Sequence, residues 1–99
     1  MKLKITNGGN IVIDKKYIFN QTKKEMFNLS DNTIKFPTSQ RKLTAYINAK
    51  YYISGKREYL VKIIWEAYKG PLPKNTKVVQ TIKGKDLSIN NLTLIKNDN

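Results

Sequence analysis

Alternating apolar and polar positions near the start of the chain predict an antiparallel hairpin over residues 2–19. Leu3 and Ile5 alternate with polar side chains, and the Asn-Gly-Gly-Asn segment at 7–10 has the composition of a tight turn. The alternation resumes after this turn, and the apolar residues at 17–19 either prolong the returning strand or begin another.

A second hairpin is expected where two short β-prone runs flank a Ser-Asp-Asn turn at 30–32. The runs cover residues 26–29 and 34–36. Pro37 ends the second run, because proline has no N–H to donate to a sheet.

A helix over residues 61–69 is predicted by apolar side chains that recur at spacings of three and four. Gly70 suits the end of this helix. Before the helix, a β-prone run over 43–53, a turn at 54–56 and a strand at 57–61 predict a third hairpin.

The last part of the chain predicts one more hairpin, with strands over 76–81 and 92–95 and a turn at 83–85. The elements together indicate an α+β fold in which antiparallel β hairpins precede a helix and a final hairpin. A chain of 99 residues supports one modest core, so we expect a single domain. Its parts are N-terminal hairpins over 1–42 and a core unit over 43–96.

The balance of charge favours a polyanionic partner. Lys and Arg total 19 against 7 acidic residues, which gives a net charge of +12. Such a field attracts nucleic acid, and DNA is favoured over RNA here. A compositional bias is the competing explanation, since the chain holds 17 Lys, 12 Ile and 11 Asn, as an AT-rich genome would encode.

The sequence predicts a cytoplasmic protein. No apolar run approaches the ~20 residues that cross a bilayer, and the N-terminus lacks the apolar stretch of a signal peptide. The absence of Cys fits a reducing compartment.

Residues 57–95 resemble the core of an HNH endonuclease, whose ββα-metal fold is a hairpin followed by a helix. The resemblance rests on W-E-A-Y-K-G-P-L-P at 65–73, V-V-Q-T-I-K-G at 78–84 and N-L at 91–92, at the spacing of that family. It implies a truncated ββα-metal-like hairpin and an origin in a phage or mobile element, where homing endonucleases of this kind are common.

The catalytic residues implied by this resemblance are missing. Gln80 and Thr81 stand where the family has His or Asp, Lys83 replaces an acid, and Val61 replaces an upstream His. The given sequence ends at Asn99, before the helix that would deliver the last metal ligand. Because the chain has no His to act as general base, we expect no enzyme activity, no metal and no cofactor.

Two regions are candidates for binding a nucleic acid or another partner. The first is a set of basic loops in the region that resembles the nuclease turn, whose ammonium groups could neutralise phosphates or could simply be solvated: Lys74, Lys77, Lys83 and Lys85. The second is an aromatic and basic region before the helix: Arg41, Lys42, Lys50, Tyr51, Lys56 and Arg57.

Strand alternation in the second region places Tyr46 and Tyr52 on one face and Tyr51 on the other, so at least one ring is exposed. The alternative is that these tyrosines are ordinary β-formers, and we favour packing against the helix for Tyr46 and Tyr52. Trp65 is expected to fill the core against the last hairpin, and Glu66 to be a helix-surface or pairing residue and not a catalytic acid.

Two function classes follow from these observations. The first is a non-catalytic nucleic-acid-binding protein on an HNH-derived scaffold, which grips backbone phosphates through Lys and Arg. The alternative is a small phage-encoded inhibitor, such as an anti-CRISPR or anti-host factor, that binds a nucleic-acid-processing protein or complex in the host cytoplasm.

Overall fold

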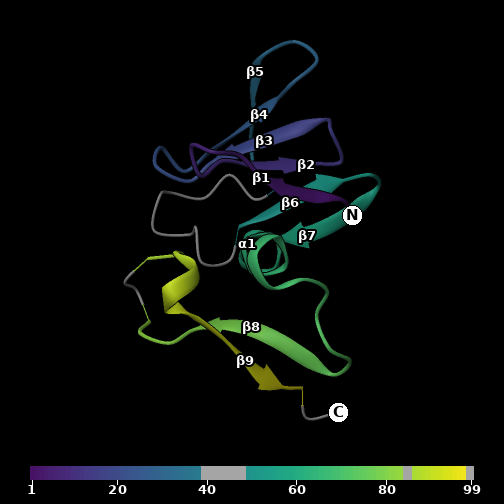
Figure 1. Ribbon diagram of the computed structural model, residues 1–99. Helices are drawn as coiled ribbons and strands as arrows, with labels where there is room; N and C mark the ends of the chain where they lie inside the picture. The colour runs from purple at the N-terminus through teal and green to yellow at the C-terminus, as the bar shows by residue number, and fades with distance from the viewer. Residues whose placement is uncertain (39–48, 84–85, 98–99) are drawn as a thin grey trace.

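The computed structural model describes residues 1–38, 49–83 and 86–97. The N-terminal part is one antiparallel sheet with the strand order β1-β2-β3-β4-β5 (Figure 1). Its strands are β1 (Leu3–Ile5), β2 (Ile11–Ile13), β3 (Tyr17–Asn20), β4 (Glu25–Asn28) and β5 (Thr33–Lys35). The two predicted hairpins are therefore confirmed, and they belong to a single continuous sheet.

Strand β3 is what joins the two hairpins. Asp14 and Lys15 both have positive φ, at 51° and 58°, and turn the chain back on β2 at once. Residues 17–19 therefore begin a new strand. On its other side β3 pairs with β4, with Phe19 opposite Met26, and both of these side chains are buried.

The second hairpin unit consists of β6 (Lys50–Ile53) and β7 (Lys56–Tyr59), and it leads directly into α1 (Leu60–Lys69). The helix ends at Gly70, whose φ of 88° is unfavourable for residues with a side chain, and whose N–H donates to the Glu66 carbonyl at 2.9 Å. Pro71 follows and cannot continue the helix.

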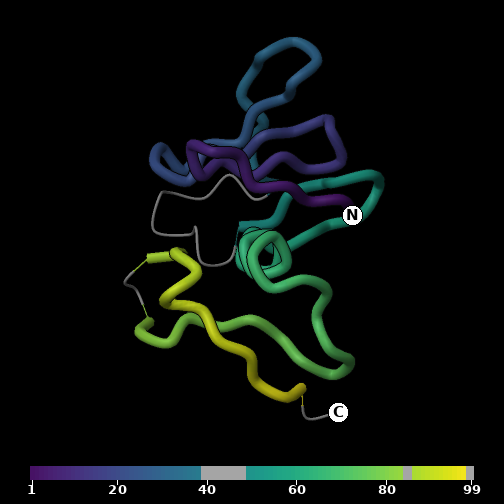
Figure 2. The backbone as a smooth tube through the Cα atoms, viewed as in Figure 1, coloured from purple at the N-terminus to yellow at the C-terminus, as the bar shows by residue number. Residues whose placement is uncertain are grey.

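The last hairpin pairs β8 (Thr76–Gln80) with β9 (Leu92–Lys96), as the sequence predicted. A short 3-10 helix, η2 (Ile89–Asn91), precedes β9 and was not expected from the sequence. Figure 2 traces how the chain runs from the sheet through β6–β7 and α1 to this hairpin. Helix α1 lies between the β6–β7 hairpin and the β8–β9 hairpin.

The core is a single buried cluster that draws side chains from the sheet, from β6, from α1 and from the start of β9. On α1 the buried stripe consists of Leu60, Val61, Ile63 and Ile64. Trp65 packs against the cluster but is only partly buried, so the expectation of a core-filling ring is corrected. Trp65 follows Val61 by one turn and so lies at the edge of the buried stripe, where the helix surface meets solvent.

The structure confirms an α+β fold with antiparallel sheets and, within the described residues, one α-helix. Across residues 1–38, 49–83 and 86–97, no helix is long and apolar enough to cross a membrane.

Candidate functional site

The outer face of the β6–β7 hairpin gathers cationic and aromatic side chains. Ser54 and Gly55 form its two-residue turn, with φ of 52° and 82°, and two successive positive φ values are typical of a type I′ turn. This turn fixes the register so that Lys50 lies opposite Tyr59 and Tyr52 lies opposite Arg57. Because directly paired residues point to the same face, these four side chains share one surface.

Each tyrosine of this surface has a cation above its ring. The Lys50 Nζ lies 4.8 Å from the centre of the Tyr59 ring, and the Arg57 guanidinium carbon lies 5.6 Å from the centre of the Tyr52 ring. Tyr52 remains 49% exposed and Tyr59 46% exposed. A cation over an exposed ring contributes only about 0.5–1 kcal/mol of interaction free energy. These contacts therefore keep each cation beside its tyrosine and leave the rings accessible to solvent. We call these residues, Lys50, Tyr52, Arg57 and Tyr59, the cation–tyrosine face.

The opposite face of the hairpin is its anchor to the core. Tyr51 and Ile53 are each only 2% exposed. The assignment of Tyr51 to the binding surface is therefore wrong, because a buried ring cannot stack on a ligand. Packing of Tyr52 against the helix is also wrong, since alternation turns its ring outward.

Asp14 fixes the turn of the hairpin to the five-stranded sheet. Its carboxylate accepts hydrogen bonds from the Lys2 backbone N–H at 2.6 Å and from the Ser54 hydroxyl at 2.9 Å. The Lys2 bond is the main reason that the pKa of Asp14 lies below its usual value of 3.8; partial burial opposes this, and the Ser54 bond and nearby positive charges support it. The ionised Asp14 carboxylate thus attaches the turn of the β6–β7 hairpin to the five-stranded sheet.

The pKa of Asp14 gives a pH-dependent prediction. A carboxyl group with a lowered pKa in the folded state adds stability above its unfolded pKa, and that stability is lost as pH falls through the folded pKa. We expect the Asp14 carboxyl to titrate, by NMR chemical shift, with a midpoint below 3.8. Ser54→Ala should move the midpoint upward. A midpoint at or above 3.8 in the unaltered chain would contradict this attachment.

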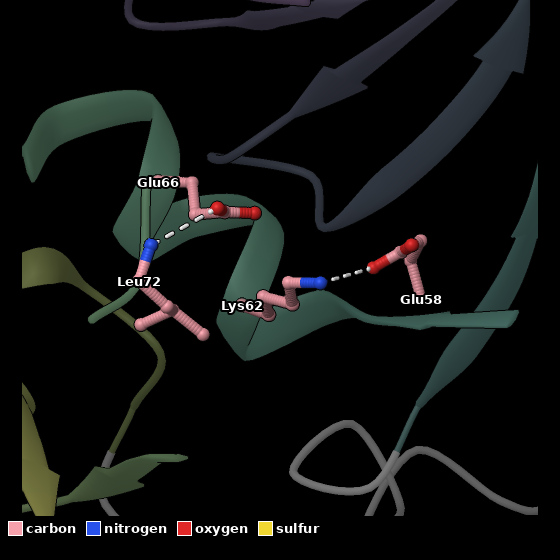
Figure 3. A network of polar contacts seen from close by, with 4 residues as sticks. All are labelled: Glu58, Lys62, Glu66 and Leu72. Atoms are coloured by element: carbon pink, nitrogen blue, oxygen red, sulfur yellow. Dashed lines mark hydrogen bonds and ion pairs between the residues drawn. The ribbon is translucent and has the colours of Figure 1, made fainter. Parts of the chain in front are cut away.

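The acidic side chains of β7 and α1 are engaged away from the cation–tyrosine face (Figure 3). Glu58 on β7 points to the inner face, and its carboxylate pairs with the Lys62 ammonium of the first turn of α1 at 3.0 Å. Glu66 accepts a hydrogen bond from the Leu72 N–H at 3.3 Å and so braces the Gly-Pro loop after the helix. Glu66 is therefore a pairing residue, as expected.

Three other sequence candidates lie apart from this hairpin. Lys74, Lys77 and Lys83 are exposed, on or beside β8, on the other side of α1 from β6 and β7 (Figure 1). Lys56 is exposed beside the hairpin turn. The other three predicted site residues, Arg41, Lys42 and Lys85, lie outside the described residues, as does Tyr46.

The turn between β8 and η2, where the resemblance places lost nuclease chemistry, is organised by Asn91. This side chain is 6% exposed; its Oδ1 accepts from the Ile82 N–H at 3.0 Å, and its Nδ2 donates to the carbonyls of Ile82 at 3.1 Å and Asp86 at 2.8 Å. Gln80 donates from Nε2 to the same Asp86 carbonyl at 2.8 Å. Within the described parts of the chain, no three His, Cys, Asp or Glu side chains gather to hold a metal.

A cavity of about 290 Å³ lies where β3, the start of α1 and the segment 86–88 meet. Three of its four polar lining side chains, all except that of Lys24, are engaged in the hydrogen bonds that follow. Gln21 donates to the Gly9 carbonyl and to the Tyr68 hydroxyl, and the Asp86 carboxylate accepts from the Ser88 hydroxyl at 2.8 Å. The cation–tyrosine face is the stronger candidate, because its polar and aromatic groups point to solvent.

Comparison with known proteins adds no relative to this description. No protein family matches the chain, and no similar chain is found among curated proteins or solved structures. The resemblance to HNH endonucleases therefore rests on the residues at 57–95 alone.

Sequence reasoning missed Tyr52 and Tyr59 as members of the site. The signal that could have found them is the Ser-Gly pair at 54–55. A two-residue turn there fixes the cross-strand pairs, and the pairs then place both tyrosines beside Lys50 and Arg57.

Proposed function

We propose that this chain is a non-catalytic nucleic-acid-binding protein that holds its ligand on the cation–tyrosine face. Lys50 and Arg57 neutralise backbone phosphates, and Tyr52 and Tyr59 offer exposed rings on which bases or sugars stack. Proteins that bind nucleic acid without reading its sequence combine these two kinds of group. The observation that carries the proposal is the alternation of cation and exposed tyrosine on one hairpin face.

The charge of the whole chain supports this choice of ligand. A net charge of +12 raises the local concentration of a polyanion and speeds its encounter with the protein. The acids nearest to the site do not oppose it, because Glu58 is paired with Lys62 on the inner face. DNA is the ligand favoured by the resemblance to homing endonucleases.

The scaffold is proposed to derive from an HNH endonuclease. The hairpin of β8 and β9 corresponds to the hairpin with which the ββα-metal fold of that family begins, and a buried Asn91 holds the connection between the two strands. The chain has no His, and a site that deprotonates water at neutral pH needs such a group. Binding without cleavage is the function that this set of residues supports.

The test of this proposal is the binding of labelled oligonucleotides, measured by fluorescence anisotropy. Tyr52→Ser/Tyr59→Ser should weaken binding to single-stranded DNA by about tenfold or more, because stacking contributes about 1–3 kcal/mol per base. Circular dichroism should stay unchanged, since both rings are largely exposed.

The matched control is Tyr68→Ser, which removes another exposed tyrosine, on α1. It should leave the affinity nearly unchanged. Equal losses in both variants would refute a specific role for the hairpin. Tight binding to a nucleic-acid-processing protein, with none to DNA or RNA, would favour the inhibitor class.

A further inference from the structure

The solvent face of the five-stranded sheet carries an unbroken apolar row. Val12 lies opposite Ile18, Ile18 opposite Phe27, and Phe27 opposite Ile34. Directly paired residues point to the same side, so the four side chains form one line across β2, β3, β4 and β5. Their neighbours along the strands, Ile11, Ile13, Phe19 and Met26, are buried on the other side of the sheet.

This row departs from the usual pattern of such a sheet. An antiparallel sheet that packs one face on the core normally presents polar side chains on the other face. Leu29 lies just beyond the end of β4 and Phe36 just beyond the end of β5, at opposite ends of this strand pair, and they are 45% and 66% exposed. Single exposed apolar residues are ordinary, whereas a contiguous patch marks an interaction surface. We call the six residues Val12, Ile18, Phe27, Leu29, Ile34 and Phe36 the apolar stripe.

The size of the stripe fits a short peptide segment. Neighbouring strands lie about 4.8 Å apart, so the row from β2 to β5 is roughly 14 Å long. Three turns of an α-helix, or a strand of four to five residues, have about the same length.

Lysines outnumber acids around the stripe, although Glu25, two residues before Phe27 on β4, lies on the same face of the sheet. Lys4 continues the row on β1, opposite Val12, while Lys15 and Lys16 form the turn between β2 and β3. Lys23 and Lys24 form the turn between β3 and β4, at the opposite end of the strands. Residues 1–38 contain seven Lys and three acids. Two of those acids are held locally, Asp14 by Lys2 and Ser54 and Asp31 by Thr33.

From this surface we propose that the apolar stripe binds a short acidic, amphipathic segment of a partner protein. Apolar side chains of the segment cover the stripe, and its carboxylates meet the lysines at both ends of the strands.

A second copy of this chain is a poor occupant, because each copy carries a net charge of +12 and the two would repel each other. Nucleic acid is also a poor occupant, since the stripe is mostly aliphatic and aliphatic side chains do not stack on bases. A bilayer is a poor occupant as well. Side chains that insert into a bilayer project from the protein surface, whereas Val12, Ile18 and Phe27 are partly buried.

The test uses three synthetic twelve-residue peptides and isothermal titration with the full chain. The first peptide has leucines at helical spacing and glutamates elsewhere. The second replaces the glutamates with lysines, and the third replaces the leucines with serines. We expect the first to bind at least tenfold more tightly than either of the others, because only it offers both the apolar and the acidic groups.

The variant Ile34→Ser/Phe36→Ser should weaken binding of the first peptide by about tenfold, while Tyr52→Ser/Tyr59→Ser should leave it unchanged. Oligonucleotide binding should be weakened by Tyr52→Ser/Tyr59→Ser and left unchanged by Ile34→Ser/Phe36→Ser. The two variants therefore separate this inference from the proposed function. The proposal is overturned if the first peptide does not bind, if the serine-containing peptide binds equally well, or if the stripe variant binds as the unaltered chain does. Loss of self-association or of anionic vesicle binding in that variant, without loss of peptide binding, would assign the stripe to those occupants instead.

Discussion

Replacing Asn91 with alanine is expected to lower the free energy of unfolding by about 2–4 kcal/mol. The side chain is almost fully buried and makes three hydrogen bonds to the backbone of the turn after β8. Alanine leaves the Ile82 N–H and the carbonyls of Ile82 and Asp86 without this partner in a partly buried place. Each such group costs about 1–3 kcal/mol when no water replaces the missing hydrogen bond.

The matched control is Asn90→Ala, in the same 3-10 helix, where the side chain is exposed. Its effect should stay within about 0.5 kcal/mol. Urea unfolding followed by circular dichroism measures both variants. Equal stability of the two would show that Asn91 does not organise the turn.

The second large effect concerns salt and charge on the β6–β7 hairpin. If the chain neutralises about four to six phosphates, the logarithm of its affinity for duplex DNA should fall with the logarithm of salt concentration at a slope of roughly −4 to −5. Substituting Lys50, Lys56 and Arg57 together by Gln should make that slope shallower by about one unit for each phosphate that is no longer neutralised. Anisotropy titrations across a range of salt concentrations measure the slope.

A triple variant on the other side of α1, with Gln at Lys74, Lys77 and Lys83, carries the same change of charge. It should alter the slope much less, because these lysines lie apart from the cation–tyrosine face. A larger change in this variant would move the phosphate-binding groups to the loops beside β8, where the resemblance to a nuclease turn places them.

The local elements of the fold were predictable because they depend on short-range pattern. The Asn-Gly-Gly-Asn turn, the Ser-Gly turn and the Gly-Pro end of the helix each fix the chain direction within a few residues. The union of two hairpins into one sheet was not predictable in this way. It depends on pairing of β3 with β4 across a polar connection that carries no pattern of its own.

The site was predicted in part, for a related reason. Alternation shows that Tyr51 and Tyr52 point to opposite faces, but it does not show which face meets the core. That choice depends on tertiary packing, where Ile53 and Leu60 lie in the same buried cluster as Tyr51. The same limit applies to Trp65, because helical spacing does not fix how far the helix is rotated towards the hairpin of β8 and β9.

Binding of nucleic acid to the outer face of β6–β7 can be tested by locating the bound DNA on the protein surface. A short single-stranded DNA is titrated into the ¹⁵N-labelled chain, and the shifts of the backbone amides are followed by NMR. We expect the largest changes at Lys50, Tyr52, Arg57 and Tyr59, with little change on the apolar stripe or along β8 and β9. Shifts concentrated on those other surfaces, or no shifts at low salt, would contradict the claim.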